Sequence, residues 1–137
     1  MPLQRDRPYG NANFLVDFGD GTAESADGGF SEVIFPAFVI GPRADAETAP
    51  PGHLILKRGF GGSLLLYTWW NEARQGRVPK RKTLHVRLLA EDHETVVAEW
   101  RFREVRPVSL SYSPLRANES GLVVETIEIA FERMEMV

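Results

Sequence analysis

Hydrophobic and polar residues alternate along three stretches in the second half of the chain. In residues 83–89 (TLHVRLL) and 95–103 (TVVAEWRFR), apolar side chains recur at every second position, and the polar segment EDHE lies between the two runs. Residues 123–131 (VVETIEIAF) repeat the pattern. A period of two is typical of a half-buried β-strand, and two such runs joined by a short polar turn predict a β-hairpin.

Shorter β-rich runs precede these stretches or lie between them, and only one segment has helical spacing. Further strands are predicted at residues 13–18, 30–40, 53–57 and 105–112, the last interrupted by Pro107. Residues 63–75 carry a wide apolar stripe, with Ser63 as a candidate N-cap and Gly76 as a candidate residue just beyond the helix. We therefore predict one mainly β domain, residues 1–137, in which two packed antiparallel sheets form a sandwich or barrel flanked by that one helix.

The predicted helix contains two adjacent tryptophans, Trp69 and Trp70. Consecutive helix positions differ in direction by about 100°, so only one of the two can point straight into the core. The other must lie at the margin of the sheet or meet a neighbouring subunit. Trp70 shares a stripe with Leu66 and Ala73, and we expect it to be the buried one. The residues expected to pack the core and the helix are Leu66, Trp69, Trp70, Trp100 and Phe102.

Composition and motifs argue against an enzyme. The chain has no cysteine, which excludes disulfides and thiol catalysis, and its net charge of −3 argues against bulk attraction to nucleic acid. The glycine turn KRGFGGS lacks the Gly-Lys-Ser/Thr of a phosphate-binding loop. His53, His85 and His93 lack metal-ligand spacing. No catalytic, cofactor or metal site is predicted, although a Ser-His-Asp site assembled from distant residues stays open.

Charged residues on the strands are expected to lie outside the core. Glu125 and Glu128 are separated by an odd number of positions on one strand, so their side chains point to opposite faces, which argues against an acid/base pair. Arg101 and Arg103 alternate with the apolar residues of their own strand. The residue pattern favours a solvated face or an ion-pair strip between subunits for these charges.

Five blocks cover nearly the whole chain in order: RPYGNANFLVDF, GGFSEV, LILKRGFGGSLLLYTWWNEARQGRV, KTLHVRLLAEDHETVVAEWRFREVRPVSL and VVETIEIAFERMEM. Together they resemble the tail tube proteins of contractile phages and the inner tube proteins of extracellular contractile injection systems. The resemblance implies a fold like that of haemolysin-coregulated protein, and homohexameric rings stacked into a hollow tube within a contractile sheath. It also implies contacts with neighbouring rings, sheath and baseplate or hub proteins, and cargo or DNA in the lumen. Arg101, Arg103, Glu125 and Glu128 then become candidates for the lumen or the subunit interface.

One segment departs from the family pattern. Between residues 33 and 56 most relatives carry a longer hairpin or loop, whereas this chain has the short, proline-rich GPRADAETAPPG at 41–52. Because that segment helps to stack rings in relatives, the resemblance makes Pro42, Arg43, Pro50 and Pro51 candidates for a ring-stacking loop. Its shortness also fits a different role in the same machine, as the ring at the baseplate from which the tube starts.

An alternative from another class is a monomeric β-sandwich that serves as a binding module, or an enzyme with a dispersed site. The first residues lack the apolar stretch of a signal peptide, and no run approaches the ~20 apolar residues that span a bilayer. We therefore expect no membrane partner. The family resemblance implies assembly in the bacterial cytoplasm, as a component of a phage virion or of an extracellular injection particle.

Overall fold

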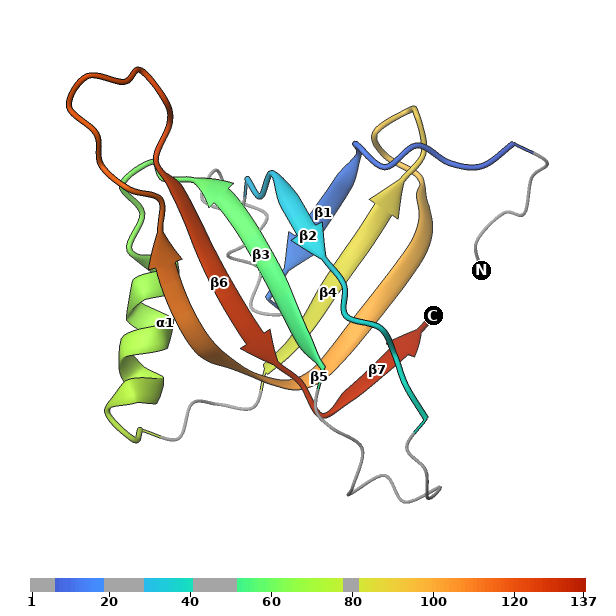
Figure 1. Cartoon of the computed structure of the whole chain (residues 1–137). Helices are drawn as coiled ribbons and strands as arrows, with labels where there is room; N and C mark the ends of the chain where they lie inside the picture. Colours follow the sequence, from blue (N-terminus) through green and yellow to red (C-terminus); the bar gives the residue numbers. More distant parts are fainter. Residues whose placement is uncertain (1–6, 19–28, 41–51, 78–81) are drawn as a thin grey trace.

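The computed structural model of the chain describes residues 7–18, 29–40, 52–77 and 82–137 (Figure 1). Within them, the alternating runs form strands and the one apolar stripe of helical spacing forms a helix. In chain order the elements are β1 (Phe14–Asp17), β2 (Glu32–Ile34), β3 (His53–Gly59), α1 (Leu65–Arg74), β4 (Lys82–Leu89), β5 (Val96–Tyr112), β6 (Val124–Ala130) and β7 (Arg133–Met136). The mainly β fold with one helix is confirmed, and the helix bounds agree with the prediction to within two residues.

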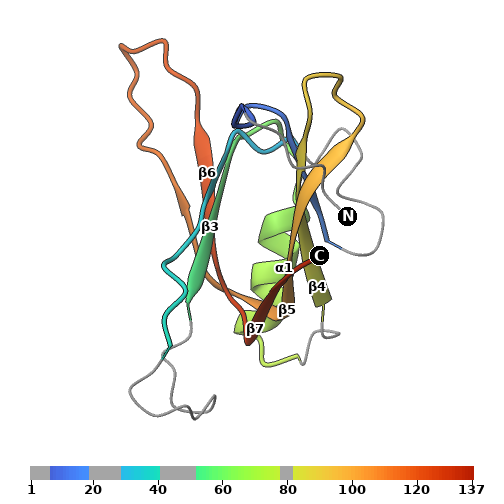
Figure 2. The same cartoon turned by 90° about the vertical axis from the view of Figure 1, so that its right-hand side faces the viewer.

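The strands of the described residues form one continuous antiparallel sheet with the order β1-β4-β5-β6-β3-β2, and β7 pairs with β5. The sheet folds over on itself into two layers. Figure 2 shows them edge-on, with β3 and β6 in one layer and β4, the first half of β5 and β7 in the other. Strands β1 and β2 form the two edges, so the sheet is open. The structure is therefore a two-layer sandwich and not a closed barrel.

Strand β5 joins the two layers. Its first half pairs with β4 and β7, and its second half pairs with β6. Between the halves, Glu104 has a φ of +54°, a left-handed conformation that is uncommon for a residue with a side chain. The pairing register with β6 then shifts between Pro107 and Ser109. A proline cannot donate to a ladder hydrogen bond and is tolerated at such a bulge, so the predicted interruption at Pro107 is wrong and one bent strand continues through it.

The core lies between the two layers and follows the predicted alternation. The core side chains point inward from strands of both layers, and several of them are fully buried. These residues include Leu54 and Leu56 of β3, Leu84 of β4, Phe102 of β5, and Ile127 and Ile129 of β6. Trp100 is partly buried and packs against this cluster from the same strand as Phe102. Burial of such side chains supplies the main favourable term in folding.

Helix α1 packs against the layered sheet through one narrow side. Leu66 and Trp69 are buried, and the Trp69 ring meets Phe18 edge-on at a centroid distance of 5.5 Å. Trp70 is only partly buried, so the expectation that Trp70 points into the core is wrong. Its ring lies 6.2 Å from the Tyr67 ring and beneath the Arg74 guanidinium, on the outer side of the helix.

The residues at the two ends of α1 agree only in part with the predicted capping residues, Ser63 and Gly76. Leu64 is the N-cap residue and provides no side-chain hydrogen bond. The neighbouring Ser63 hydroxyl accepts a hydrogen bond from the backbone N–H of Leu65 at 3.2 Å. After Gln75, Gly76 adopts a φ of +73°. This is the left-handed conformation that commonly ends a helix and that glycine adopts at no steric cost.

Candidate functional site: assembly surfaces

The outer face of the β1-β4-β5 layer carries a network of ion pairs centred on Glu99. Arg87 donates from Nε to Glu99 Oε1 at 2.6 Å, and Arg101 donates from Nε to Glu99 Oε2 at 2.6 Å. His85 Nδ1 lies 3.5 Å from the same carboxylate. Arg87 also donates to Asp17 Oδ2 of β1 at 3.3 Å. We call this set, Asp17, His85, Arg87, Glu99 and Arg101, the ion-pair face.

The arginines of this face lower the pKa of Glu99. Burial by itself would raise the pKa of the Glu99 carboxyl, but hydrogen bonds from Arg87 and Arg101 outweigh it and lower the pKa to about 2. The hydrogen bond with Glu99 raises the pKa of Arg87 in turn. Glu99 and Arg87 therefore both stay charged across the ordinary pH range.

This network predicts an acid-dependent loss of stability. A folded-state pKa of about 2, below the ordinary value of 4.5, means that Glu99 stabilises the fold above pH 4.5. This contribution disappears as the pH falls toward 2, because the unfolded chain takes up the proton first. We expect Glu99→Gln to be less stable than the wild type at neutral pH and to lose less on acidification. Urea unfolding at about pH 7 and about pH 3 tests this, and parallel pH dependence in both proteins would contradict it.

Arg103 extends the charged surface to strand β7. Its Nε donates to Glu135 Oε1 at 2.8 Å, and Arg133 Nε lies 3.7 Å from the same oxygen. This hydrogen bond with Arg103 lowers the pKa of Glu135. Arg101 and Arg103, which the sequence places outside the core, thus both lie on the outer face and pair with carboxylates there.

The outer face of the other layer carries a second carboxylate cluster, centred on Glu128. The Glu128 carboxylate accepts a hydrogen bond from Ser109 Oγ at 3.1 Å and lies 3.0 Å from His53 Nδ1. The three residue types are those of a catalytic triad, but both partners bind the carboxylate and the serine hydroxyl does not bond to the imidazole. A triad requires the histidine between the other two groups, so this cluster holds strands β3, β5 and β6 together and does not activate a nucleophile.

Glu125 does not lie on either outer face. Its side chain is completely buried (0% exposed), and its Oε1 accepts a hydrogen bond from Arg58 Nε at 2.8 Å. Tyr112 donates its hydroxyl to Oε2 at 2.7 Å. The expectation that Glu125 lies outside the core, at a lumen or interface, is therefore wrong. A buried carboxylate is tolerated here because a cation and two hydrogen bonds compensate its desolvation.

The partner of Glu125 was missed by reasoning from the sequence. Arg58 follows Leu54 and Leu56 at the same two-residue spacing, so strand parity places it on the core face. Glu125 shares parity with Ile127 and Ile129 in the same way. The two charges lie directly opposite each other in the β3–β6 register. Burial and the hydrogen bond to Glu125 raise the pKa of Tyr112 to about 12.

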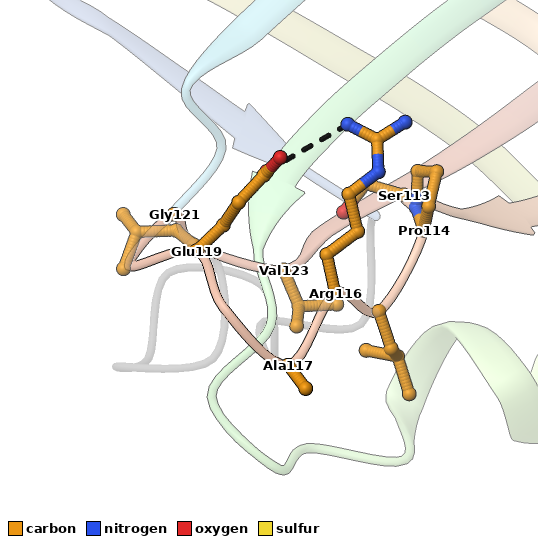
Figure 3. Close-up of a pocket in the computed structure, with 9 residues that line it drawn as sticks. Ser113, Pro114, Arg116, Ala117, Glu119, Gly121 and Val123 are labelled. Atoms are coloured by element: carbon orange, nitrogen blue, oxygen red, sulfur yellow. Dashed lines mark ion pairs between the residues drawn. The ribbon is translucent and has the colours of Figure 1, made fainter.

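The described residues include an open hollow of about 540 Å³. It is formed by the β5–β6 loop, residues 113–123 (Figure 3). Arg116 Nη1 lies 3.6 Å from Glu119 Oε2 across the loop, and both side chains are exposed. Groups that would polarise a substrate in a water-excluded site do not converge there.

Three further observations bear on the expected sites. Among the described residues no cluster of histidine, aspartate and glutamate has the makeup of a metal site. In the same part of the chain, no helix has the length and apolar character needed to cross a membrane. The candidate ring-stacking residues Pro42, Arg43, Pro50 and Pro51 lie outside the described residues.

An open two-layer sheet with ion-paired outer faces defines a β-rich scaffold. The family model of T4-like virus tail tube protein gp19 matches residues 46–135, more than half of the chain. The chain belongs to this family. Membership confirms the expected structural, non-enzymatic role and the resemblance to contractile-tail tube proteins.

Solved structures share the fold at low sequence identity. A chain of the PVC extracellular contractile injection system sheath/tube terminator has a TM-score of 0.78 and 20% identity, covering 96% of this chain and 98% of that one. A chain of the PVC sheath–tube complex in the extended state has a TM-score of 0.74 and 19% identity, covering 96% and 93%. Hcp1 from Flavobacterium johnsoniae has a TM-score of 0.57 and 16% identity, covering 90% and 93%. These matches confirm the expected fold, while a search of curated protein sequences finds no match.

Proposed function

We propose that this chain is the subunit of hexameric rings that stack into the inner tube of a contractile tail or injection particle. The tube would carry cargo or DNA through its lumen and would sit inside a contractile sheath above a baseplate. Membership of the tail tube family carries this proposal. The similarity to chains of two injection-system structures over nearly the whole length supports it.

The open edges of the sheet give a physical reason for ring formation. Within the described residues β1 pairs only with β4, and β2 pairs only with β3. Leu15 on β1 and Ile34 on β2 also leave large apolar side chains exposed. Unpaired strand edges are templates for pairing with another chain. We propose that neighbouring subunits cover these edges in the ring. Each subunit would contribute one domain, residues 1–137.

The charged outer faces supply the other surfaces that a ring needs. We assign Arg101, Arg103 and Glu128 to the lumen wall or to contacts between subunits. Their partners, Glu99, Glu135 and His53, lie within the same subunit. A wall of internally matched charges would attract neither cations nor anions strongly, which suits a conduit through which a cargo must slide.

A second role within the same machine is favoured by the short segment at residues 41–52. If Pro42, Arg43, Pro50 and Pro51 replace a longer stacking loop, this ring would meet a different protein on one side. The chain would then form a ring at one end of the tube, next to the baseplate. Purified protein that grows into long tubes without any partner would exclude this second role.

We expect the purified protein to assemble into six-subunit rings. Native mass spectrometry at increasing protein concentration should give a hexamer, and negative-stain electron microscopy should show annuli with a central channel. The control is Leu15→Lys on edge strand β1, which replaces an exposed apolar side chain with a charge of the kind that prevents edge pairing. A protein that stays monomeric at high concentration would contradict ring formation and favour a free β-sandwich binding module.

A further inference from the structure

Helix α1 and the segment that follows β2 lie at opposite sides of the two-layer sheet. In Figure 1, α1 is at the left-hand side, whereas residues 35–40 descend from β2 at the right-hand side, where β7 also lies. Figure 2 turns this right-hand side toward the viewer, so that α1 is seen behind, between the two layers. Both sides leave large apolar side chains exposed.

The outer side of α1 carries an aromatic patch. The Tyr67 ring is 40% exposed and lies 6.2 Å from the partly buried Trp70 ring. The exposed Phe60 ring meets the Tyr112 ring edge-on at 5.9 Å. Besides burial and Glu125, Tyr67 also raises the pKa of Tyr112, so the two pairs of rings are neighbours. With the exposed leucine at the start of the helix, these side chains form what we call the helix patch: Phe60, Leu64, Tyr67, Trp70 and Tyr112.

The opposite side carries a second apolar patch, on β7 and the segment after β2. The Phe35 ring lies 5.0 Å from the Trp100 ring, and the Phe38 ring lies 6.2 Å from the Phe131 ring, but both phenylalanines remain exposed. Met136 pairs with Trp100 in the β5–β7 register and is 60% exposed. Together with the exposed valine of the same segment, they form what we call the strap patch: Phe35, Phe38, Val39 and Met136.

Close packing fixes the position of the strap patch. A Cβ at Gly52 would lie 2.9 Å from the Phe131 ring and 3.0 Å from Pro36 Cγ. A glycine at this position therefore lets the segment after β2 lie directly against the chain that enters β3. A surface that is already ordered pays little conformational entropy when a partner binds to it.

Both patches consist of residue types that anchor protein interfaces. Tryptophan and tyrosine are enriched among the residues that contribute most of the binding energy. Phenylalanine and methionine are enriched in interface cores, and monomeric soluble proteins rarely expose large contiguous apolar patches. The sequence leaves the margin of the sheet or a neighbouring subunit for the tryptophan that does not enter the core, and the structure shows that this residue is Trp70.

We propose that the helix patch of one copy binds the strap patch of the next copy in the same ring. The inference rests on the proposed ring-forming function and names the two surfaces that meet within a ring. Two different patches at opposite sides of one molecule make a heterologous contact, and such a contact generates a ring when the rotation between copies closes. Each copy then covers both of its patches. A patch that met its own counterpart would instead give a two-fold dimer and leave the other patch exposed.

A charge placed in either patch tests the contact from both sides. Tyr67→Glu changes the helix patch and Met136→Glu changes the strap patch, and both side chains are exposed in the subunit. Because the contact would bury the new carboxylate, each variant should raise the protein concentration at which half of the chains are in rings by at least about tenfold. Native mass spectrometry over a dilution series measures this concentration.

Leu115→Glu is the matched control. It introduces the same charge at an 83% exposed leucine of the β5–β6 loop, outside both patches. Ring formation by this variant should equal that of the wild type. Urea unfolding at a concentration where every protein is monomeric should give similar stabilities for the three variants, which separates a lost contact from a damaged fold.

Cross-linking identifies which surfaces meet. The chain has no cysteine, so Tyr67→Cys and Met136→Cys introduce its only thiols, and a short bismaleimide joins thiols of adjacent copies. The double variant should give a ladder of covalent species up to the hexamer on a denaturing gel, because α1 and β7 of one chain lie at opposite sides (Figure 1). Each single variant should run as a monomer, and an equimolar mixture of the two should stop at dimers.

The outcomes separate this inference from the proposed function. A ladder in the double variant, together with weaker ring formation by both glutamate variants, supports the contact between the helix patch and the strap patch. Rings that tolerate both glutamates, rings of the double variant without cross-links, or dimers from a single cysteine variant would overturn it and leave ring formation intact. A wild-type protein that forms no rings would remove the proposed function, and this contact with it.

Discussion

Replacing Trp69 with alanine is expected to lower the free energy of unfolding by about 3–5 kcal/mol. The Trp69 side chain is 5% exposed, its ring meets Phe18 edge-on, and Lys82 Nζ lies 5.7 Å from its ring centroid. Its removal would leave a large cavity between α1 and the sheet, because the paired strands cannot collapse into the space. Urea unfolding followed by circular dichroism gives the change.

Trp70→Ala is the matched control, since it deletes the same side chain one position along the same helix. Trp70 contacts mainly Tyr67 and Arg74 on the outer side. Loss of such exposed contacts should cost about 1 kcal/mol or less. All proteins should be compared at one concentration, because assembly adds to apparent stability. If Trp70→Ala destabilised the fold as much as Trp69→Ala or more, the face of the helix that carries Trp70 would be the one that packs against the sheet.

The two tryptophans illustrate a limit of periodicity. The sequence predicts the helix and shows that only one tryptophan can be central. Both Leu66–Trp70 and Leu65–Trp69 fit helical spacing, and the pattern does not choose between them. The choice depends on how the helix is rotated against the sheet, where the Trp69 ring packs against Phe18. That contact joins residues far apart in the chain, and local spacing carries no information about it.

The strands were predictable to the extent that they alternate. The 83–89 and 95–103 runs form the predicted hairpin as β4 and β5, and 123–131 forms β6. The length of β5 was not predictable, because a proline normally signals the end of a strand. Here the left-handed Glu104 and the register shift after Pro107 bend the strand, so that it continues from one layer into the other.

The assembly surfaces were predictable only in part. Strand parity alone puts Arg101 and Arg103 on an outer face, where the structure has them. Charged residues are rarely buried, and this general tendency predicts the wrong place for Glu125, whereas its shared parity with Ile127 and Ile129 predicts the right one. The class of protein followed from the resemblance of whole blocks to tail tube proteins. Alternation, by contrast, indicates only a two-layer β protein.

The buried pair provides the second large prediction. Glu125→Leu is expected to destabilise the fold by about 3–5 kcal/mol. The substitution puts an apolar side chain of similar size at this position but leaves the Arg58 guanidinium buried without the carboxylate that neutralises it. It also removes the acceptor of the Tyr112 hydroxyl. A chemical denaturation curve of the variant, measured beside the wild type at neutral pH, gives the loss.

The double variant Arg58→Met with Glu125→Leu shows whether Glu125→Leu destabilises the fold because Arg58 loses its charge partner or because the hydrogen-bond geometry at this position is lost. Replacing both members of a buried pair with apolar residues of similar volume is often neutral or stabilising, because neither charge then has to leave water. We therefore expect the double variant to recover most of the stability that Glu125→Leu loses. A double variant that remains as unstable as the single one would mean that this position depends on the geometry of the hydrogen bonds. The pair would then do more than compensate two buried charges, since it would also set the register in which β3 lies against β6.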